Sequence, residues 1–412
     1  MKITLHILII SILFAGTIRA GETLEAGNEA LKRGDFSNAI EYYKQAIKNE
    51  PAFSEYVNLG HCYAQLEQWG DASSAYEEAI KLKPEAINTQ LYCSLGRAYF
   101  ENKKYEQAKE VFAKAFSLEP ANSEIELWIA RCLIELKQWI ESESILLGRF
   151  IREPDDTVTL ELLAYVYNQH GNISGIITIY RKLVDIKPQN MAYRITLAKI
   201  LKNDGQNKQA IDVLEFARKV DLDNNTEISR ILGDLYLAEN MPREAIRCYK
   251  AIMKNSDKYS ADYYYRLGIA YFLIGDYVSS GDIFNAMRKS YPEDFRADLY
   301  LGSIFAEKKS FEQAMNCYRS AIVKNYKSIE SYEALAELEI KNNLYSNAAG
   351  NLLKAIELGD NRSQVYYNYL FALVKEGDSD KIKAAFKTAF AEYPSSTSIR
   401  HLLNQYIKDK YF

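Results

Sequence analysis

The fold of this chain is decided by a stretch that recurs along it, and residues 261–292 carry one copy: ADYYYRLGIAYFLIGDYVSSGDIFNAMRKSYP. In its first half, apolar and aromatic residues such as Leu267 and Tyr271 recur at the spacing of one helix face. Gly275 and the aspartate after it interrupt this pattern, a second apolar face follows, and Pro292 closes the stretch. Two helices of this length joined by a short turn lie antiparallel, so the stretch predicts a helical hairpin.

The small residues of this stretch predict where its two helices cross. Gly268 and Ser280 are expected at the closest approach, because a larger side chain at either position would push the backbones apart. Phe284 is expected to fill the space beside the crossing, and burial of such a ring contributes about 1.5 to 3 kcal/mol. One hairpin cannot bury both of its faces, so neighbouring hairpins are required.

The same small residues return along the whole chain. The position of Ser280 recurs at spacings of 33 to 36 residues, at Ala39, Ala72, Ala108, Ser142, Ile176, Ala210, Ala245, Ser280, Ala314, Ala348 and Ile382. The position of Gly268 recurs at Gly27, Gly60, Gly96, Ala130, Ala164, Ala198, Gly233, Gly268, Gly302, Ala336 and Leu370. A fixed period of this length is typical of stacked helical hairpins, and it favours a binding function over catalysis.

Two further positions of each copy carry a recurring residue type. After the second small residue stands an aromatic residue or leucine, at Tyr43, Tyr76, Phe112, Leu146, Tyr180, Leu214, Tyr249, Phe284, Tyr318, Leu352 and Phe386. Seven of the eight prolines occupy the closing position, at Pro51, Pro84, Pro120, Pro154, Pro188, Pro292 and Pro394. Together these positions resemble the tetratricopeptide repeat family, whose pattern has small residues at its eighth, twentieth and twenty-seventh positions, aromatics between them and a closing proline.

The resemblance implies an all-α fold, a right-handed superhelix (solenoid) of stacked antiparallel helical hairpins. About eleven repeats would cover residues 21–394. Residues 395–412 are expected to form a helix that caps the last hairpin, because Ile399, Leu402 and Tyr406 lie at helical spacing beside charged residues.

Some copies depart from the pattern. Ile176 and Ile382 replace the small twentieth residue, Arg149 replaces the small twenty-seventh, and Glu339 stands where most copies place Tyr, Phe or Leu. We expect wider helix spacing over residues 142–185. We also expect the stem of Arg149 to pack while its charged head reaches water.

The first twenty residues differ from the rest of the chain. Lys2 is followed by an almost wholly apolar stretch over residues 3–14, and a small residue, Ala20, ends the segment. This order predicts a secretory signal peptide over residues 1–20. The alternative is an uncleaved membrane anchor over residues 3–18, although a membrane span needs about 20 apolar residues.

Charge and cysteine content narrow the classes of function. The chain has 51 Lys and Arg against 55 Asp and Glu, a net charge of −4, and removal of the predicted signal peptide would leave 49 against 55. No nucleic acid is expected as a partner, because nucleic-acid binders normally carry a basic footprint. No two of the five cysteines have the spacing of a metal or redox motif, so we expect small core residues at Cys62, Cys93, Cys132, Cys248 and Cys317.

No motif predicts catalysis. The three histidines outside the first twenty residues, His61, His170 and His401, lie in copies far apart, and none has a partner at metal-ligand spacing. Glycine-rich phosphate loops, nucleophile elbows and paired-histidine helix motifs do not occur in the sequence. We therefore expect a protein that is not an enzyme and that uses no cofactor or metal.

The resemblance also implies a binding face. In the family the first helices line the concave surface, and residues at the ninth and neighbouring variable positions commonly face the ligand. Carried over by position, the candidate partner-binding residues are His61, Arg97, Arg131, Tyr165, Lys199, Lys202, Asp234 and Glu337. Basic residues come early along this face and acidic residues late, so it would orient an extended partner of the opposite polarity. The alternative is that these are ordinary solvated charges, each contributing little.

The carboxylate clamp used by some members of the family is not predicted. Asn58 occupies one of its positions, but Val57 and His61 stand where the clamp has Lys and Asn. Aromatic residues such as Tyr165 and Tyr265 are candidates for stacking on a peptide or a glycan.

The sequence thus predicts an exported, non-catalytic scaffold that binds a protein or an extended peptide in its concave groove. In a bacterium it would act in the periplasm, in envelope assembly, secretion or polysaccharide export, with glycan-related machinery among its candidate partners. The alternative is a membrane-tethered adaptor with its repeats in the cytoplasm. RNA binding by a related helical repeat is disfavoured by the acidic balance of the chain.

Overall fold

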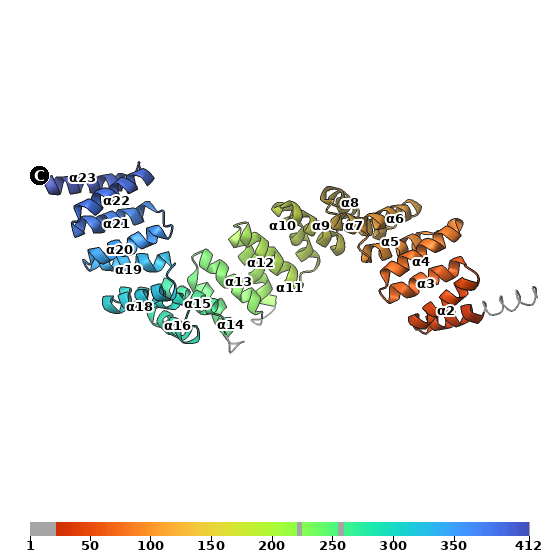
Figure 1. The fold of residues 1–412 in the computed structure, drawn as a ribbon. Coiled ribbons are helices and arrows are strands. Elements are labelled where there is room, and N and C mark those ends of the chain that lie inside the picture. The colour runs from red at the N-terminus through yellow and green to blue at the C-terminus, as the bar shows by residue number, and fades with distance from the viewer. Residues whose placement is uncertain (1–21, 221–224, 254–258, 412) are drawn as a thin grey trace, which may run out of the picture. The chain divides into compact units, whose positions relative to one another are not determined.

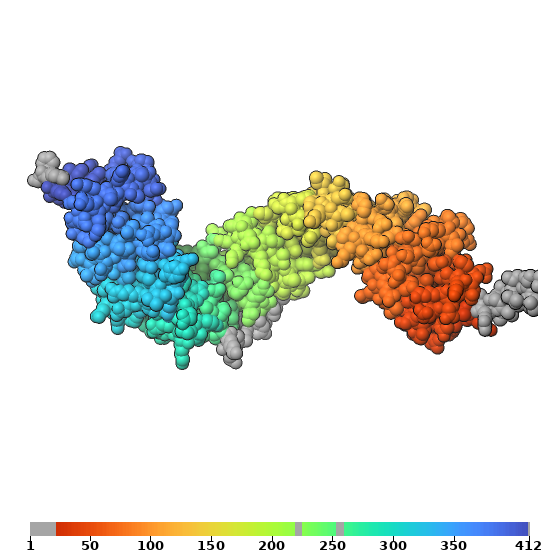
Figure 2. Space-filling model, in the orientation of Figure 1, coloured from red at the N-terminus to blue at the C-terminus, as the bar shows by residue number. Residues whose placement is uncertain are grey.

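The structure is a computed structural model that describes residues 22–220, 225–253 and 259–411. The predicted signal peptide, residues 1–20, lies outside the described residues. The chain divides into two compact units, unit 1 (residues 1–200) and unit 2 (residues 201–412), each considered by itself below. Within each unit successive hairpins follow one another in chain order (Figures 1 and 2).

Unit 1 is built from helices alone in its described part. Residues 22–32 are helical. They are followed by α2 (Phe36–Asn49), α3 (Phe53–Gln65), α4 (Trp69–Leu82), the short 3-10 helix η1 (Pro84–Ala86), α5 (Thr89–Glu101), α6 (Tyr105–Leu118), α7 (Ser123–Glu135), α8 (Trp139–Arg152), α9 (Thr157–His170) and α10 (Ile173–Ile186). The boundary between the units falls within α11 (Met191–Asn203).

Unit 2 continues the alternation of short helices. It contains α12 (Asn207–Val220), α13 (Thr226–Ala238), α14 (Pro242–Met253), α15 (Ala261–Leu273), α16 (Tyr277–Ser290), α17 (Phe295–Glu307), α18 (Phe311–Lys324), α19 (Ile329–Lys341), α20 (Tyr345–Glu357), α21 (Ser363–Glu376), α22 (Ser379–Glu392) and α23 (Thr397–Tyr411). The predicted all-α fold of tandem hairpins is confirmed. In each hairpin the odd-numbered helix is the first and the even-numbered helix the second.

The turn inside each hairpin has one residue in the left-handed region, at an equivalent position in successive hairpins. These residues are Gly34, Glu67, Lys103, Lys137, Gly171, Gly205, Asn240, Gly275, Lys309, Asn343 and Gly377. A residue with a side chain pays about 1 to 2 kcal/mol for this conformation. The glycines avoid that cost, and elsewhere the packing of the two helices must offset it.

The predicted helix crossing at Gly268 and Ser280 is confirmed. The Ser280 hydroxyl donates to the Gly268 carbonyl oxygen at 2.9 Å. A Cβ atom on Gly268 would lie 2.5 Å from the ring of Phe284, which is fully buried. The missing side chain of the glycine therefore makes the room that the ring fills.

The same fit between a glycine on the first helix and a large ring on the second recurs in other hairpins. A Cβ on Gly60 would lie 2.6 Å from the Tyr76 ring, and one on Gly302 would lie 2.5 Å from the Tyr318 ring. Where the first helix carries alanine instead, the residue in the ring position is usually leucine: Ala130 is matched by Leu146, Ala198 by Leu214 and Ala336 by Leu352. Ala164 is matched by Tyr180, and that tyrosine is only partly buried.

Several hairpins pack less closely than the first ones, α7–α8 with Ser142 among them, and two of these carry isoleucine at the twentieth position. Ile176 and Ile382 are both buried, and α9–α10 and α21–α22 pack less closely than α3–α4 or α5–α6. A groove of about 410 Å³ opens between α8 and α10, with Phe150 and Ile179 among its lining residues. This agrees with the wider spacing that we predicted for residues 142–185.

Arg149 corrects the prediction that its charged head reaches water. Its side chain is only 3% exposed, and its guanidinium group is enclosed by polar partners. Nε donates to the Thr159 hydroxyl at 3.0 Å, Nη2 donates to Asp156 at 3.0 Å, and Nη1 donates to the Ser123 carbonyl oxygen. Acidic and hydroxyl groups around the start of α9 satisfy the charge inside the protein, so the head has no need to reach solvent.

Glu339 is a second charged residue inside the helix stack. It is 1% exposed, and its carboxylate accepts a hydrogen bond from the Asn351 side chain at 2.8 Å. Burial raises the pKa of Glu339, although Asn351 and the more distant Arg319 favour the ionised form. Because the folded state binds the proton more tightly than the unfolded state, Glu339 favours folding at low pH. That contribution is lost as the pH rises through its folded pKa.

Replacing Glu339 by glutamine should therefore stabilise the protein at neutral pH. We expect E339Q to raise the free energy of unfolding by about 1 kcal/mol at pH 7, because it removes a buried charge and keeps an acceptor for Asn351. The gain should shrink as the pH falls towards the ordinary carboxyl pKa. Urea unfolding of both proteins between pH 7 and pH 4.5 measures it, and a gain that grows on acidification would contradict the assignment.

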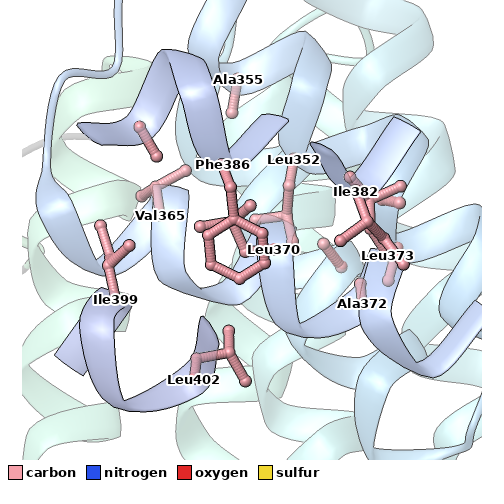
Figure 3. Packing of buried hydrophobic residues seen from close by; sticks show 14 of the residues in the cluster. Leu352, Ala355, Val365, Leu370, Ala372, Leu373, Ile382, Phe386, Ile399 and Leu402 are labelled. Carbon is pink, nitrogen blue, oxygen red and sulfur yellow. The ribbon is translucent and has the colours of Figure 1, made fainter. Parts of the chain in front are cut away.

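The last helix lies against the end of the stack. Ile399 and Leu402 of α23 join a buried cluster that includes Val365 of α21 and Phe386 of α22 (Figure 3). This is the region for which the sequence predicts a capping helix. Among the cysteines, Cys62, Cys132 and Cys248 are buried as expected, whereas Cys93 and Cys317 are only half-buried.

Candidate functional site

One surface of each unit is lined by first helices. In unit 1, α3 contacts α5 and α7 contacts α9, and in unit 2, α15 contacts α17 and α17 contacts α19. The predicted partner-binding residues lie on these first helices. In unit 1, His61, Arg97, Tyr165 and Lys199 are exposed, and Arg131 is half-buried.

Two of these residues, Arg97 and Arg131, meet at one aromatic ring. The Cζ atom of Arg131 lies 4.9 Å from the centroid of the Trp128 ring, and the Cζ atom of Arg97 lies 6.0 Å from it. Phe112 stacks on Trp128 with centroids 5.5 Å apart and planes 9° apart, and Phe100 meets it edge-on at 5.4 Å. Arg97, Trp128 and Arg131 are called the Trp128 cluster below.

A pocket of about 270 Å³ lies beside the Trp128 cluster, between α5 and α7. Its lining includes Gln90, Ser94, Arg97 and Trp128, with Glu124 as the acidic member. Most of these groups donate hydrogen bonds. The pocket therefore suits a small polar or anionic group.

The Trp128 cluster holds positive charge that no described residue neutralises at ion-pairing distance. Among the described residues, neither Arg97 nor Arg131 forms an ion pair or a hydrogen bond, and both guanidinium groups contact the Trp128 ring instead. Stacking on an indole ring stabilises a cation by about 0.5 to 2 kcal/mol but leaves its N–H donors available. Both arginines can therefore still bind an anion.

Unit 2 uses its basic residues in a different way. Asp234 is only 7% exposed, and it accepts hydrogen bonds from the Tyr249 hydroxyl at 2.8 Å and from Arg266 at 2.7 Å. Arg230 and Lys202 each place a nitrogen 3.6 Å from the same carboxylate. Asp234 and Lys202, both predicted to face a ligand, are thus brought together, but they bind each other and their neighbours.

A second pocket, of about 430 Å³, lies beside Asp234. Arg230 and Arg266 line it together with Tyr249, Tyr259 and Tyr263, and Glu227 and Asp262 are its acidic members. Burial raises the pKa of Tyr263 far above its usual range, so this hydroxyl remains protonated. It donates to the backbone carbonyl of Tyr249, which fixes the wall of the pocket.

The predicted acidic end of the binding face is partly neutralised. Besides Asp234, Glu333 pairs with Arg362 at 2.5 Å. Glu307 and Glu337 are exposed, and neither forms an ion pair with a described residue. Of the acidic residues in the later part of the predicted binding face, Glu307 and Glu337 are therefore the ones that stay available to a partner.

The candidate aromatic residues also divide into two groups. Tyr165 is 48% exposed and touches Trp139 at its edge, so it remains accessible. Tyr265 instead packs against Tyr300 at 5.5 Å, and Arg296 lies 4.7 Å from its centroid. Tyr265 therefore contributes mainly to the contact between neighbouring hairpins.

Sequence reasoning did not single out Trp128, Arg230 or Arg266. Trp128 lies three residues before Arg131 on the same helix, a spacing that places both on one face. That spacing was the available signal for the cluster. Arg230 stands in the same relation to Asp234, four residues before it on α13.

Sites of other kinds are not found in the described part of the chain. No group of three or more His, Cys, Asp or Glu residues there is arranged to hold a metal ion. Within residues 22–220, 225–253 and 259–411, no helix is both long and apolar enough to cross a membrane.

The tandem helical hairpins, with their first helices side by side, define the class of this protein as a helical-repeat solenoid. Residues 24–87, 99–164 and 232–294 match models of the tetratricopeptide repeat. These three segments therefore match the repeat that the spacing of the small residues predicted. Such repeats are typical of scaffold proteins that bind other proteins.

The curated relatives match only a small part of the chain. Sperm-associated antigen 1 of Rattus norvegicus is 32% identical over 65 residues, which is 16% of this chain and 7% of that protein. The Homo sapiens protein of the same name is 31% identical over 67 residues, again 16% of this chain and 7% of that protein. The chain thus spans about 7% of the length of these relatives.

Two solved structures are similar over most of the chain, and a third is similar over less than half of it. The Cut9–Hcn1 hetero-tetramer of the APC/C matches at 12% identity and a TM-score of 0.43, covering 94% of this chain and 96% of that one. Yeast Tom70 matches at 15% identity and a TM-score of 0.41, covering 95% of each chain. YrrB, described as a protein with an unusual peptide-binding site, matches at 19% identity and a TM-score of 0.38, covering 42% of this chain and 88% of that one.

Proposed function

We propose that this protein is a non-catalytic scaffold that binds an extended segment of a protein partner along its first helices. The observation that supports this most strongly is the Trp128 cluster, where two arginines on adjacent first helices have no counter-ion among the described residues. Two positive charges held beside one ring without a counter-ion repel each other, and a bound anion would relieve that repulsion. Function in a repeat fold resides in such local sites rather than in the fold itself.

We further propose that the protein is exported and acts in a bacterial periplasm, in envelope assembly, secretion or polysaccharide export. The support is the order of charged, apolar and small residues over positions 1–20. The alternative is an adaptor anchored by residues 3–18. Sequencing of the N-terminus of the native protein separates the two, because a chain that begins at Gly21 cannot be anchored in this way.

The binding proposal predicts which charges a partner requires. Reversal of Arg97, Arg131 and Lys199 to glutamate should abolish capture of the partner from an envelope extract, because a carboxylate that paired with these residues would then be repelled. Immobilised wild-type and variant proteins are compared by mass spectrometry of the retained proteins. The expected result is at least one abundant protein retained by the wild type and lost from the variant.

A matched variant controls for the change in net charge. Lys48, Lys114 and Lys208 are exposed residues of the second helices α2, α6 and α12, so reversing them to glutamate changes the net charge equally. This variant should capture the same partner as the wild type. If the variant reversed at Arg97, Arg131 and Lys199 retains the same proteins as the wild type, binding through the first helices is refuted.

A further inference from the structure

We propose that the Trp128 cluster is a binding site for one acidic side chain, a glutamate or an aspartate, of an extended partner segment. This inference rests on the proposed function and assigns it a chemical class of ligand. The site consists of Arg97 on α5 and Arg131 and Trp128 on α7, with Gln90 in the adjoining pocket.

The first argument is the contrast between the basic residues of the two units. In unit 2, Lys202, Arg230 and Arg266 all lie within 3.6 Å of the Asp234 carboxylate. In unit 1, Arg97 and Arg131 meet no carboxylate at ion-pairing distance among the described residues. Among the described residues, no carboxylate pairs with Arg97 and Arg131 as Asp234 pairs with the basic residues of unit 2, and a ligand carboxylate would supply that partner.

The second argument is that the arginines are held in place before the ligand arrives. The Trp128 ring stacks on Phe112 and meets Phe100 edge-on, and the guanidinium group of Arg131 lies 4.9 Å from its centroid. A planar guanidinium matches a carboxylate with two parallel hydrogen bonds, which a lysine cannot do. Fixing it in advance lowers the entropy that binding would cost.

The third argument concerns the size and charge of the pocket. At about 270 Å³ it is small, and Gln90 offers a further amide donor from its wall. Arg97 and Glu124 both line this pocket, and Arg131 lies beside the same Trp128 ring without lining the pocket, so these three charges together leave an excess of one positive charge. One carboxylate would neutralise that excess, whereas a second would be repelled.

A peptide carboxylate is favoured over the phosphate of a nucleic acid. A polyphosphate chain would meet a protein with a net charge of −4 and a single local excess of positive charge. Nucleic-acid binding depends on many phosphate contacts along a basic surface. A single acidic side chain needs only this site.

The test is direct binding of labelled peptides to the full chain. Fluorescence anisotropy at low ionic strength should show hexaglutamate binding to the wild type and hexalysine failing to bind. The double variant R97A/R131A should bind hexaglutamate about tenfold more weakly, whereas K48A/K114A, matched in charge but on second helices, should bind it like the wild type. Circular dichroism shows that each variant is folded. The single variant R97A, at an exposed position, provides the same test with the half-buried Arg131 unchanged.

Three results would overturn the inference: no binding of hexaglutamate to the wild type, equal binding to R97A/R131A, or tighter binding of hexauridylate than of hexaglutamate. A further arm separates charge from geometry. R97K/R131K keeps both charges, so it should recover only part of the lost affinity if the planar guanidinium groups matter. If hexaglutamate does not bind and charge reversal still abolishes capture of the native partner, the proposed function stands and the assignment of an acidic side chain fails.

Discussion

Replacing Arg149 by alanine is expected to lower the free energy of unfolding by about 3 to 5 kcal/mol. The side chain is 3% exposed, and its removal leaves Asp156 and Glu126 without their central partner. Burial disfavours the charged form of Asp156, but hydrogen bonds from Thr159 and Arg149 outweigh this and keep the pKa of its carboxyl below the usual value. Without Arg149 part of that stabilisation is lost. Urea unfolding at pH 7 measures the change.

Arg152 provides a matched control on the same helix. It also pairs with Glu126, but its own side chain is 54% exposed. Exposed ion pairs contribute about 0 to 1 kcal/mol, so R152A should cost far less than R149A. Equal losses for the two variants would show that the charged head of Arg149 is solvated, as was predicted from the sequence. Hydrogen exchange should place the loss in α7, α8 and α9, because the partners of Arg149 lie on these helices and the loop between them.

Replacing Gly268 by alanine is expected to cost about 1 to 3 kcal/mol, although alanine is the better helix former. The new Cβ would lie 2.5 Å from a ring that is fully buried and cannot move without disturbing its neighbours. A Cβ atom added to Gly281, on the facing helix α16, would have no other atom within 4 Å. G281A should therefore stabilise the protein by about 0.5 to 1 kcal/mol, the usual gain for this change in a helix.

A second substitution should rescue the first. Hairpins with alanine at the position of Gly268 carry leucine at the position of Phe284 in three of four described cases, Ala130 with Leu146 being one. We therefore expect G268A and F284L to be coupled, with the double variant more stable than the sum of the two single losses predicts. Thermal unfolding of the wild type, the two single variants and the double variant measures this coupling as a double-mutant cycle. Purely additive losses would contradict the idea that the side-chain sizes at positions 268 and 284 compensate each other.

Much of the fold could be predicted because the repeat depends on steric rules that act locally. The spacing of Gly268, Ser280 and Phe284 placed one hairpin, and the recurrence of that spacing placed its neighbours. The exchange of glycine plus ring for alanine plus leucine was also present in the sequence, but it became a recognisable rule only once the distances from Gly268 to the Phe284 ring were known.

The environments of the charged residues could not be predicted in this way. Arg149 and Asp234 are each enclosed by groups from two or more helices, and a position in a repeat does not show which neighbours converge on it. Asp234 was predicted to face a ligand, and the structure shows that it also accepts a hydrogen bond from Arg266 as an internal counter-ion. Arg97 and Arg131 were chosen by the same rule, and only the structure shows that neither forms an ion pair with a described residue.

We propose that specificity resides on the first helices of the repeats, at residues that the fold itself does not need. The most direct test is the ratio of partner captured by two variants of equal charge, one reversed at Arg97, Arg131 and Lys199 and the other at exposed lysines of the second helices. We predict that the variant reversed on the first helices loses the partner, while the variant reversed on the second helices retains it at the wild-type level. Equal capture by the two variants, or loss from both, would contradict it.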